Sequence, residues 1–160
     1  MSTVVSPKTG RIRAWMDRIP LHYEYTAGAA GELFLRGLKE GTVTASKCTM
    51  CGEVRLPPRG YCLECGARTR VDVAVLHPGM LAAISREPGG AKGKPGRTFG
   101  FVTFAGVEGG MVHMILHEGR QEAKVGAQVM ATFKPKDERD GSVLDLLGFR
   151  TAAKTPSGND

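Results

Sequence analysis

Residues 47–66 read KCTMCGEVRLPPRGYCLECG, and this stretch decides the fold of the chain. It holds two Cys-x-x-Cys pairs separated by ten residues, and they use every cysteine in the sequence: Cys48, Cys51, Cys62 and Cys65. Two such pairs a short loop apart can place four thiolates around one tetrahedral ion, and Zn²⁺ is the ion expected with four sulfur ligands. Two disulfides, or four unrelated core cysteines, are the alternatives. Because the paired spacing favours a metal, we expect one zinc ion per chain.

The predicted metal site is closed. A glycine follows each pair, Gly52 and Gly66, where a tight turn costs little strain and lets backbone N–H groups approach the sulfur atoms. Four protein ligands leave no coordination position for water or substrate. Such a site contributes to folding rather than to Lewis-acid catalysis. The function of the chain must therefore be sought outside the metal site.

The composition is that of a globular protein. The 160 residues are 41% hydrophobic, which suits one compact domain or two small ones, while 22 glycines and 6% aromatic residues indicate many turns and short strands. No apolar run reaches the roughly 18–20 residues needed to span a bilayer, and the start of the sequence lacks the apolar core of a secretory signal. We therefore expect no membrane association. Because the cysteines are assigned to a metal, a reducing, cytoplasmic location is expected.

The charge of the chain is moderately positive. The formal net charge of +6 falls to +4 once four thiolates and a divalent ion are counted. The basic residues concentrate in three segments, 8–18, 47–70 and 86–97, without forming one continuous run. A solvated surface and an anion-binding surface both account for this pattern.

One helix is predicted before the cysteine motif, after an extended or weakly ordered arm over residues 1–20. Ala30, Leu33, Phe34 and Leu38 recur at helical spacing, and Gly41 stands where a helix usually ends. Three glycines inside this segment weaken its intrinsic propensity. The helix therefore needs a packing surface, which its own domain or a partner protein would provide.

The rest of the chain reads as short strands separated by turn signals. Strands are expected over residues 71–75, 80–86, 98–105, 111–116, 128–134 and 142–149. Several short strands without a strong helix indicate a small closed barrel, and an OB-like barrel fits best because closure removes exposed edges. The predicted fold class is mainly β, with an N-terminal helix, a zinc ribbon and a small OB-fold barrel. We divide the chain into an arm and helix, a ribbon, a barrel and a flexible tail, at residues 1–41, 42–70, 71–150 and 151–160.

These segments, in this order, resemble a known family. The helical segment reads GELFLRGLKEG, the ribbon TASKCTMCGEVRLPPRGYCLECG, and the barrel opens with HPGMLAAIS. The chain is similar to the thiolase-associated family that joins a rubredoxin-like zinc ribbon to an acyl-CoA-associated OB-fold. The resemblance covers residues 22 to about 150, and its most specific pieces are Pro57-Pro58-Arg59 and the phrase FLRGLKEG over residues 34–41.

The resemblance implies a non-catalytic subunit that binds a thiolase-type enzyme, or sometimes a hydratase, acting on coenzyme A thioesters. It suggests a heterotetramer with two copies of each protein, and a bulky aromatic or steroid-derived acyl-CoA as the substrate. The four cysteines carry over as metal ligands. No catalytic residue carries over, because the family is not known for one.

The residues themselves agree that the chain is not an enzyme on its own. Thiolase chemistry needs a nucleophilic cysteine and oriented acid/base groups, but here every cysteine is assigned to the metal. The histidines are scattered over different segments, at positions 22, 77, 113 and 117. The reactive cysteine should therefore belong to a partner.

Two further surfaces have a functional and a structural interpretation. Lys92, Lys94 and Arg97 lie in the glycine-rich segment 87–97 and suit the phosphates of coenzyme A, although this segment also reads as a plain connection between strands. Phe99 and Phe101 fall on one face of a strand, as in OB-folds that stack the bases of single-stranded nucleic acids. We predict instead that the two rings fill the barrel interior.

Overall fold

The computed structural model describes residues 3–5, 14–16, 20, 22, 25–75, 78–87, 96–116 and 123–151, and only the backbone of the first two ranges. In chain order the elements are β1 (Thr3–Val5), β2 (Ala14–Met16), α1 (Gly28–Lys39), β3 (Thr44–Cys48), β4 (Val54–Leu56), β5 (Thr69–Ala74), β6 (Gly79–Arg86), β7 (Thr98–Phe104), β8 (Val107–Leu116), β9 (Gln128–Phe133), the 3₁₀ helices η1 (Lys136–Glu138) and η2 (Val143–Asp145), and β10 (Leu146–Thr151). The short strands β1 and β2 pair with each other.

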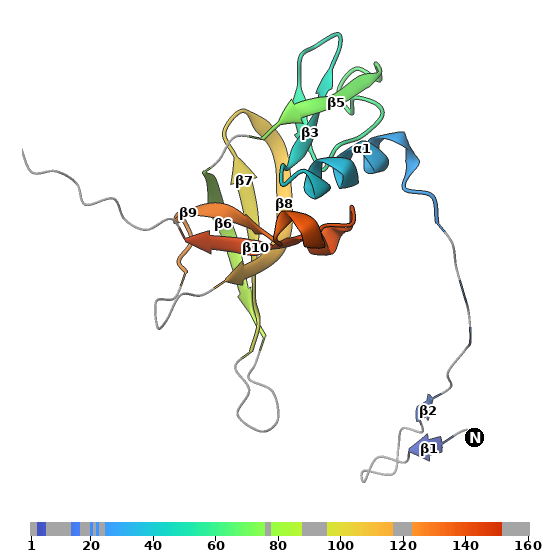
Figure 1. Cartoon of the computed structure of the whole chain (residues 1–160), viewed down its shortest axis with the longest axis vertical. Helices are drawn as coiled ribbons and strands as arrows, with labels where there is room; N and C mark the ends of the chain where they lie inside the picture. The colour runs from blue at the N-terminus through green and yellow to red at the C-terminus, as the bar shows by residue number, and fades with distance from the viewer. Residues whose placement is uncertain are drawn as a thin grey trace, which may run out of the picture.

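Strands β6 to β10 form a closed five-stranded barrel (Figure 1). Neighbouring strands run antiparallel in the order β10-β9-β6-β7-β8, and the barrel closes where β8 and β10 pair in parallel through Ile115 and Phe149. One parallel closing pair in an otherwise antiparallel five-stranded barrel is the OB-fold arrangement. The predicted OB-like barrel is confirmed. Within it, residues 143–145, expected as strand, form η2 instead.

The barrel interior is filled by alternating residues of its strands. On β7 the buried side is Thr98, Gly100, Val102 and Phe104. Gly100 has no room for a side chain, because a Cβ there would overlap Leu81 and also come within 2.7 Å of Ile115. The space beside Gly100 is thus filled by the aliphatic side chains of Leu81 and Ile115 from the neighbouring strands.

The cysteine-bearing segment forms a three-stranded sheet that continues into the barrel. β3 lies between β4 and β5 and pairs antiparallel with both, while β4 pairs in parallel with the start of β8 through Arg55–Glu108 and Leu56–Gly109. The strand expected over 71–75 is present as β5, but it pairs with β3 rather than with a barrel strand. Alternation of valine with polar residues predicts a half-buried strand without specifying which sheet it joins.

Helix α1 packs on its own domain, which decides between the two alternatives left open by the sequence. The helix contacts β3, β5 and η2, and its residue Leu38 is only 1% exposed. The helix ends as predicted: Gly41 has φ +80°, and the N–H groups of Gly41 and Thr42 bond the carbonyls of Leu38 and Gly37 at 2.9 and 2.8 Å. Leu38 therefore belongs to the core, and Leu33 remains on the outer side.

A buried carboxylate, which no sequence pattern predicted, anchors the segment between β9 and β10. Asp145 is fully buried, and its oxygens accept backbone N–H bonds from Gly141, Ser142 and Asp140 at 2.7, 3.1 and 3.3 Å. Burial alone would raise the pKa of Asp145, but these bonds and nearby Lys134 hold it below its ordinary value. The anchored loop positions η2 against α1.

Within the described part of the chain, no helix has both the length and the apolar character needed to cross a membrane.

Candidate metal centre

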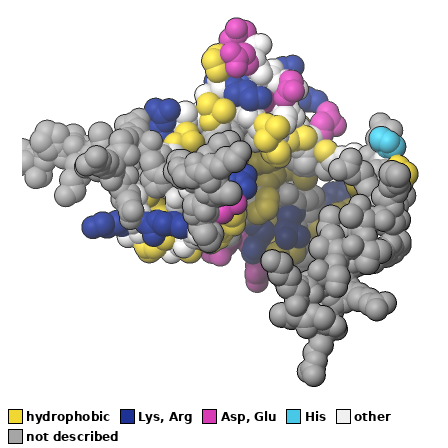
Figure 2. All heavy atoms as spheres, turned by 90° about the horizontal axis from the view of Figure 1, so that it is seen from below, with side chains coloured by type: hydrophobic (Ala, Val, Ile, Leu, Met, Phe, Trp, Pro, Cys, Tyr) yellow, Lys and Arg dark blue, Asp and Glu magenta, His cyan; other side chains and the backbone are white. Residues whose placement is uncertain are grey.

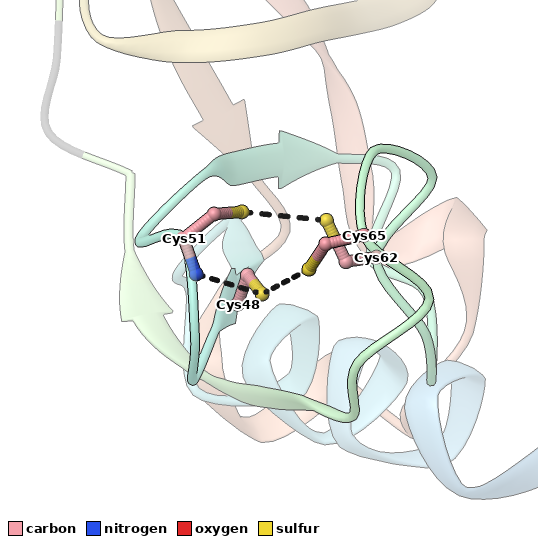
Figure 3. Close-up of side chains that lie close together, drawn as sticks. All are labelled: Cys48, Cys51, Cys62 and Cys65. Carbon is pink, nitrogen blue, oxygen red and sulfur yellow. Dashed lines mark hydrogen bonds between the residues drawn. The ribbon is translucent and has the colours of Figure 1, made fainter.

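The four cysteines converge at one end of the three-stranded sheet (Figure 3). Cys48 is the last residue of β3, and Cys51 follows it in the turn that leads to β4. Cys62 and Cys65 stand in a second turn, closed by the bridge between Tyr61 and Arg68. Two separate turns therefore face each other and direct their sulfur atoms into the same space.

The spacing of the sulfur atoms suits a tetrahedral ion. All four Sγ atoms lie within 4.8 Å of one another, with Cys48–Cys65 at 3.5 Å and Cys51–Cys62 at 3.6 Å. Sulfurs about 2.3 Å from a tetrahedral zinc ion are separated by roughly 3.8 Å, whereas a disulfide needs about 2.05 Å. All four cysteines are free. The predicted four-cysteine metal site is confirmed, and two disulfides are excluded.

Backbone groups support the site as predicted. Gly52 and Gly66 both adopt positive φ, +78° and +71°, which lets each turn fold back tightly. The N–H groups of Met50 and Cys51 each donate to the sulfur of Cys48 at 3.4 Å. The N–H of Cys51 first, and that of Met50 second, lower the pKa of the Cys48 thiol to about 6. Cys48 is thus prepared as a thiolate ligand.

A charged group that the sequence analysis missed lies against the metal site. The thiol of Cys62 donates to Glu53 Oε2 at 3.0 Å, and this bond raises the pKa of Cys62. Arg55 pairs with Glu53 and also reaches Glu64 at 3.6 Å. The side chains of Glu53 and Arg55 are only 12% and 22% exposed. The guanidinium of Arg55 therefore compensates the charge of the largely buried Glu53 carboxylate beside the sulfur ligands.

The three residues proposed for coenzyme A phosphates have different outcomes. Lys92 and Lys94 lie outside the described residues. Arg97 forms a forked ion pair with Glu87, with Nε–Oε2 at 2.8 Å and Nη2–Oε1 at 3.2 Å, and its guanidinium also lies 5.6 Å from the ring centroid of Phe99. Arg97 ends the glycine-rich segment, and its contacts with Glu87 and Phe99 orient its guanidinium group.

The prediction that Phe99 and Phe101 fill the barrel interior is wrong. The buried side of β7 carries the alternate residues, and neither ring packs against the core. Phe99 and Phe101 lie half-buried on the outer face, opposite Met114 and the exposed Val112 of β8. The ring of Phe101 covers Gly110, where a Cβ would come within 3.0 Å of it. The sequence analysis thus predicted strand β7 correctly but assigned its inward-facing and outward-facing residues the wrong way round.

The histidines do not assemble a catalytic group among the described residues. His113 is half-buried beside Phe149, with ring centroids 6.3 Å apart, and its Nδ1 has no hydrogen-bond partner there. Burial lowers the pKa of His113, so it is a neutral packing residue at pH 7. His22 is exposed, while His77 and His117 lie outside the described residues.

On the face drawn in Figure 2, neither sign of charge dominates among the described residues. In Figure 2 the described Lys and Arg side chains lie among hydrophobic and acidic ones rather than in one basic stripe. This distribution fits the modest net charge expected from the sequence.

Comparisons with known proteins agree with this architecture. Residues 36–71 match the family model described as ChsH2, rubredoxin-like zinc ribbon domain. A crystal structure of a Sulfolobus solfataricus protein of unknown function from the DUF35 family is 26% identical, with a TM-score of 0.63 over 81% of this chain and 90% of that one. No curated protein sequence matches the chain.

A second similar structure comes from a protein complex. It is named Ltp2-ChsH2(DUF35) aldolase and is 18% identical, with a TM-score of 0.56 over 75% of this chain and 92% of that one. At this identity the likeness concerns the fold. The family model, the four-cysteine site and the two structures together show a rubredoxin-like zinc ribbon joined to an OB-fold barrel, an architecture similar to that of the DUF35-family protein.

Proposed function

We propose that the chain is a zinc-binding accessory subunit of a thiolase-type enzyme complex that acts on acyl-CoA. The observation that carries this proposal is the closed metal site, which gathers every cysteine of the chain into one cluster. No cysteine is left as a nucleophile, so the reactive thiol must come from another protein. The similar structure named as an Ltp2-ChsH2(DUF35) complex supports a partner subunit.

The partner in this proposal forms or cleaves a carbon–carbon bond. The similar complex is called an aldolase, and both thiolases and aldolases act at a bond next to a carbonyl carbon. We propose two copies of each subunit in the assembly, one structural Zn²⁺ per chain, and a bulky aromatic or steroid-derived acyl-CoA as substrate. An acyl-CoA hydratase is the alternative partner.

Co-purification tests this proposal. The tagged chain is expressed in its source organism, and its stable partner is identified by mass spectrometry. We expect a thiolase- or aldolase-like protein in equal stoichiometry, no acyl-CoA cleavage by the chain alone, and higher activity of the partner when the chain is added. Thiolysis by the isolated chain would contradict the proposal, and a hydratase as the stable partner would select the alternative.

We further propose that Lys92, Lys94 and Arg97 contact the phosphates of coenzyme A in that complex. A phosphate would replace Glu87 as the partner of the Arg97 fork. Replacing all three basic residues by alanine should raise the KM for the CoA substrate several-fold, with a smaller decrease in kcat, because these groups hold a remote part of the molecule. Glu87→Gln is the matched control and should not raise KM. Unchanged kinetics of the triple variant would reduce the segment to a connection between strands.

A second candidate function is binding of single-stranded nucleic acid. The outward position of Phe99 and Phe101, with Arg97 over one ring, favours it, since OB-folds stack bases on such aromatic residues. Binding of labelled single-stranded DNA and RNA that weakens steeply with salt and is lost in Phe99→Ala and Phe101→Ala would support this candidate. We expect no such binding, because the net charge is modest and the basic residues form no continuous run in the sequence.

A further inference from the structure

A groove lies between the first turns of α1 and the strand β5. Its volume is about 870 Å³. Its apolar lining includes Ala30 and Leu33 of the helix, Val71 of β5, and Tyr61 from the second cysteine turn. Leu33 and Tyr61 are 40% and 62% exposed. An apolar groove that leaves large side chains accessible is a surface suited to a ligand or a partner.

The groove follows an open edge of the sheet. β5 is the last strand in the sheet order, and β3 is its partner among the described strands. Its first residues also pair with the second cysteine turn, where Tyr61 bridges Arg68 and the N–H of Thr69 donates to the carbonyl of Gly60 at 3.1 Å. The open part of the edge therefore begins after Thr69. Five consecutive residues of this segment, 68–72, line the groove, so both its backbone and its side chains border the space. The edge of a sheet offers unpaired N–H and C=O groups that an added strand can bond.

The rim of the groove is mainly positive. Arg68 and Arg70 line it, and Asp72 is the acidic residue that opposes them, 3.6 Å from Arg70. The side chain of Arg70 remains 64% exposed despite this contact. Helix α1 also begins here, and its first turn contains no acidic residue, so the positive end of its dipole adds to the same sign.

The N-terminal arm of the chain is not a suitable strand. Residues 1–19 carry four basic residues and one acidic residue, which is the wrong sign for a rim with two arginines. A second copy of β5, paired antiparallel about Val71, would set Arg70 opposite Asp72 but Arg68 opposite Ala74, so Arg68 of each copy would still lack a carboxylate. The occupant should therefore be foreign, extended, and acidic at alternate positions.

We propose that an extended segment of the catalytic partner, with acidic and apolar residues in alternation, adds to the edge of β5 as a further strand. Its apolar side chains lie against Leu33, Tyr61 and Val71, and its carboxylates face Arg68 and Arg70. This inference rests on the proposed function for the identity of the partner, but not for the chemistry of the groove.

A peptide titration tests the groove by itself. The probe is a short peptide of alternating glutamate and valine, added to the ¹⁵N-labelled, zinc-loaded full chain. We expect amide shifts over residues 29–33 and 69–74. The same peptide N-methylated at alternate residues, which removes the strand N–H groups, should cause at least tenfold weaker binding, as should a lysine–valine peptide. Equal binding of the methylated peptide, or shifts elsewhere on the chain, would overturn the strand-addition proposal.

Charge reversal supplies the matched variants. Arg68→Glu with Arg70→Glu should weaken acidic-peptide binding at least tenfold, whereas Lys124→Glu with Lys136→Glu makes the same charge change away from the groove and should leave it unaltered. Unchanged thermal stability and zinc content confirm that the ribbon is intact. Equal affinities of the two double variants would contradict the proposed role of the rim.

Hydrogen exchange in the complex tests the identity of the occupant. Amides of β5 should exchange more slowly when the catalytic subunit is bound, and unchanged exchange would mean that the partner docks elsewhere. If no catalytic partner is found, the proposed function fails, but the peptide titration still decides whether the groove binds an acidic strand. If a partner binds and the peptide does not, the groove proposal fails and the proposed function stands.

Discussion

Replacing Cys62 by serine should unfold the ribbon, and this is the largest effect that we expect from any single substitution. Cys48 and Cys62 are among the few buried side chains of the segment 44–74, so the metal supplies much of its interior. In zinc-finger peptides a structural zinc ion contributes an apparent binding free energy of about 10–16 kcal/mol. With one ligand missing, the amide signals of β3, β4 and β5 should collapse, and metal analysis should find less than one ion per chain.

The matched control is Met50→Ser, in the same turn as Cys48. Met50 is 79% exposed, and the substitution leaves all four sulfur ligands in place, so both stability and zinc content should be retained. Chelation of zinc from the native protein should reproduce the effect of Cys62→Ser. A purified chain that keeps its ribbon signals with little metal bound would contradict the structural role of the site.

The same site should respond to acid. Metal binding requires thiolates, and the pKa of Cys62 is raised by its bond to Glu53, while that of Cys48 is lowered to about 6. Protons therefore compete with the metal as the pH falls, and zinc should be released on the acidic side of neutrality and retained above it.

The second large effect should come from Gly37→Ala. In an exposed helix this change stabilises by about 1 kcal/mol, but here α1 crosses β3 at Gly37. A Cβ would overlap Thr44 Oγ1 and lie 3.1 Å from the carbonyl oxygen of Thr42. Because overpacking costs about 1–3 kcal/mol, we expect the free energy of unfolding to decrease by that amount or more.

Gly31→Ala is the control within the same helix. A Cβ at Gly31 would meet only Ala27 Cβ, at 3.3 Å, and Ala27 is exposed and can shift slightly. This variant should be as stable as the native chain or slightly more stable in denaturant unfolding of the zinc-loaded protein. Equal stabilisation by both substitutions would mean that α1 does not approach β3 closely at Gly37.

The local features were predictable because their causes are local. The paired cysteines define a metal site by spacing alone, and Gly41 ends a helix because few other residues adopt its positive φ. The partner of β5 was not predictable in the same way, since the valine alternation is satisfied equally by the ribbon and by the barrel. Strand pairing between distant segments depends on the three-dimensional arrangement, which a repeat of two residues does not specify.

Phe99 and Phe101 show a different limit. Hydrophobicity assigns the larger residues of an alternating strand to the interior, but the interior at β7 is already occupied by Leu81 and Ile115 next to Gly100. The space that the other strands leave beside Gly100 is too small for a phenylalanine ring, so the face of β7 with Gly100 points inward. The role of Asp145 was not predicted either. Its hydrogen-bond donors are backbone N–H groups, and because every residue type except proline carries one, no side-chain pattern in the sequence marks them.

Strand β8 has a mechanical consequence, because its first half pairs with β4 of the ribbon and its second half with β10 of the barrel. A continuous strand resists bending far more than a flexible linker does. Because one strand belongs to both sheets, the sulfur cluster and the barrel keep a nearly fixed distance from each other. A protein bound to the ribbon would therefore lie at a fixed distance and angle from anything bound to the outer barrel surface. The chain can in this way serve as a spacer, and the length of β8 sets the spacing.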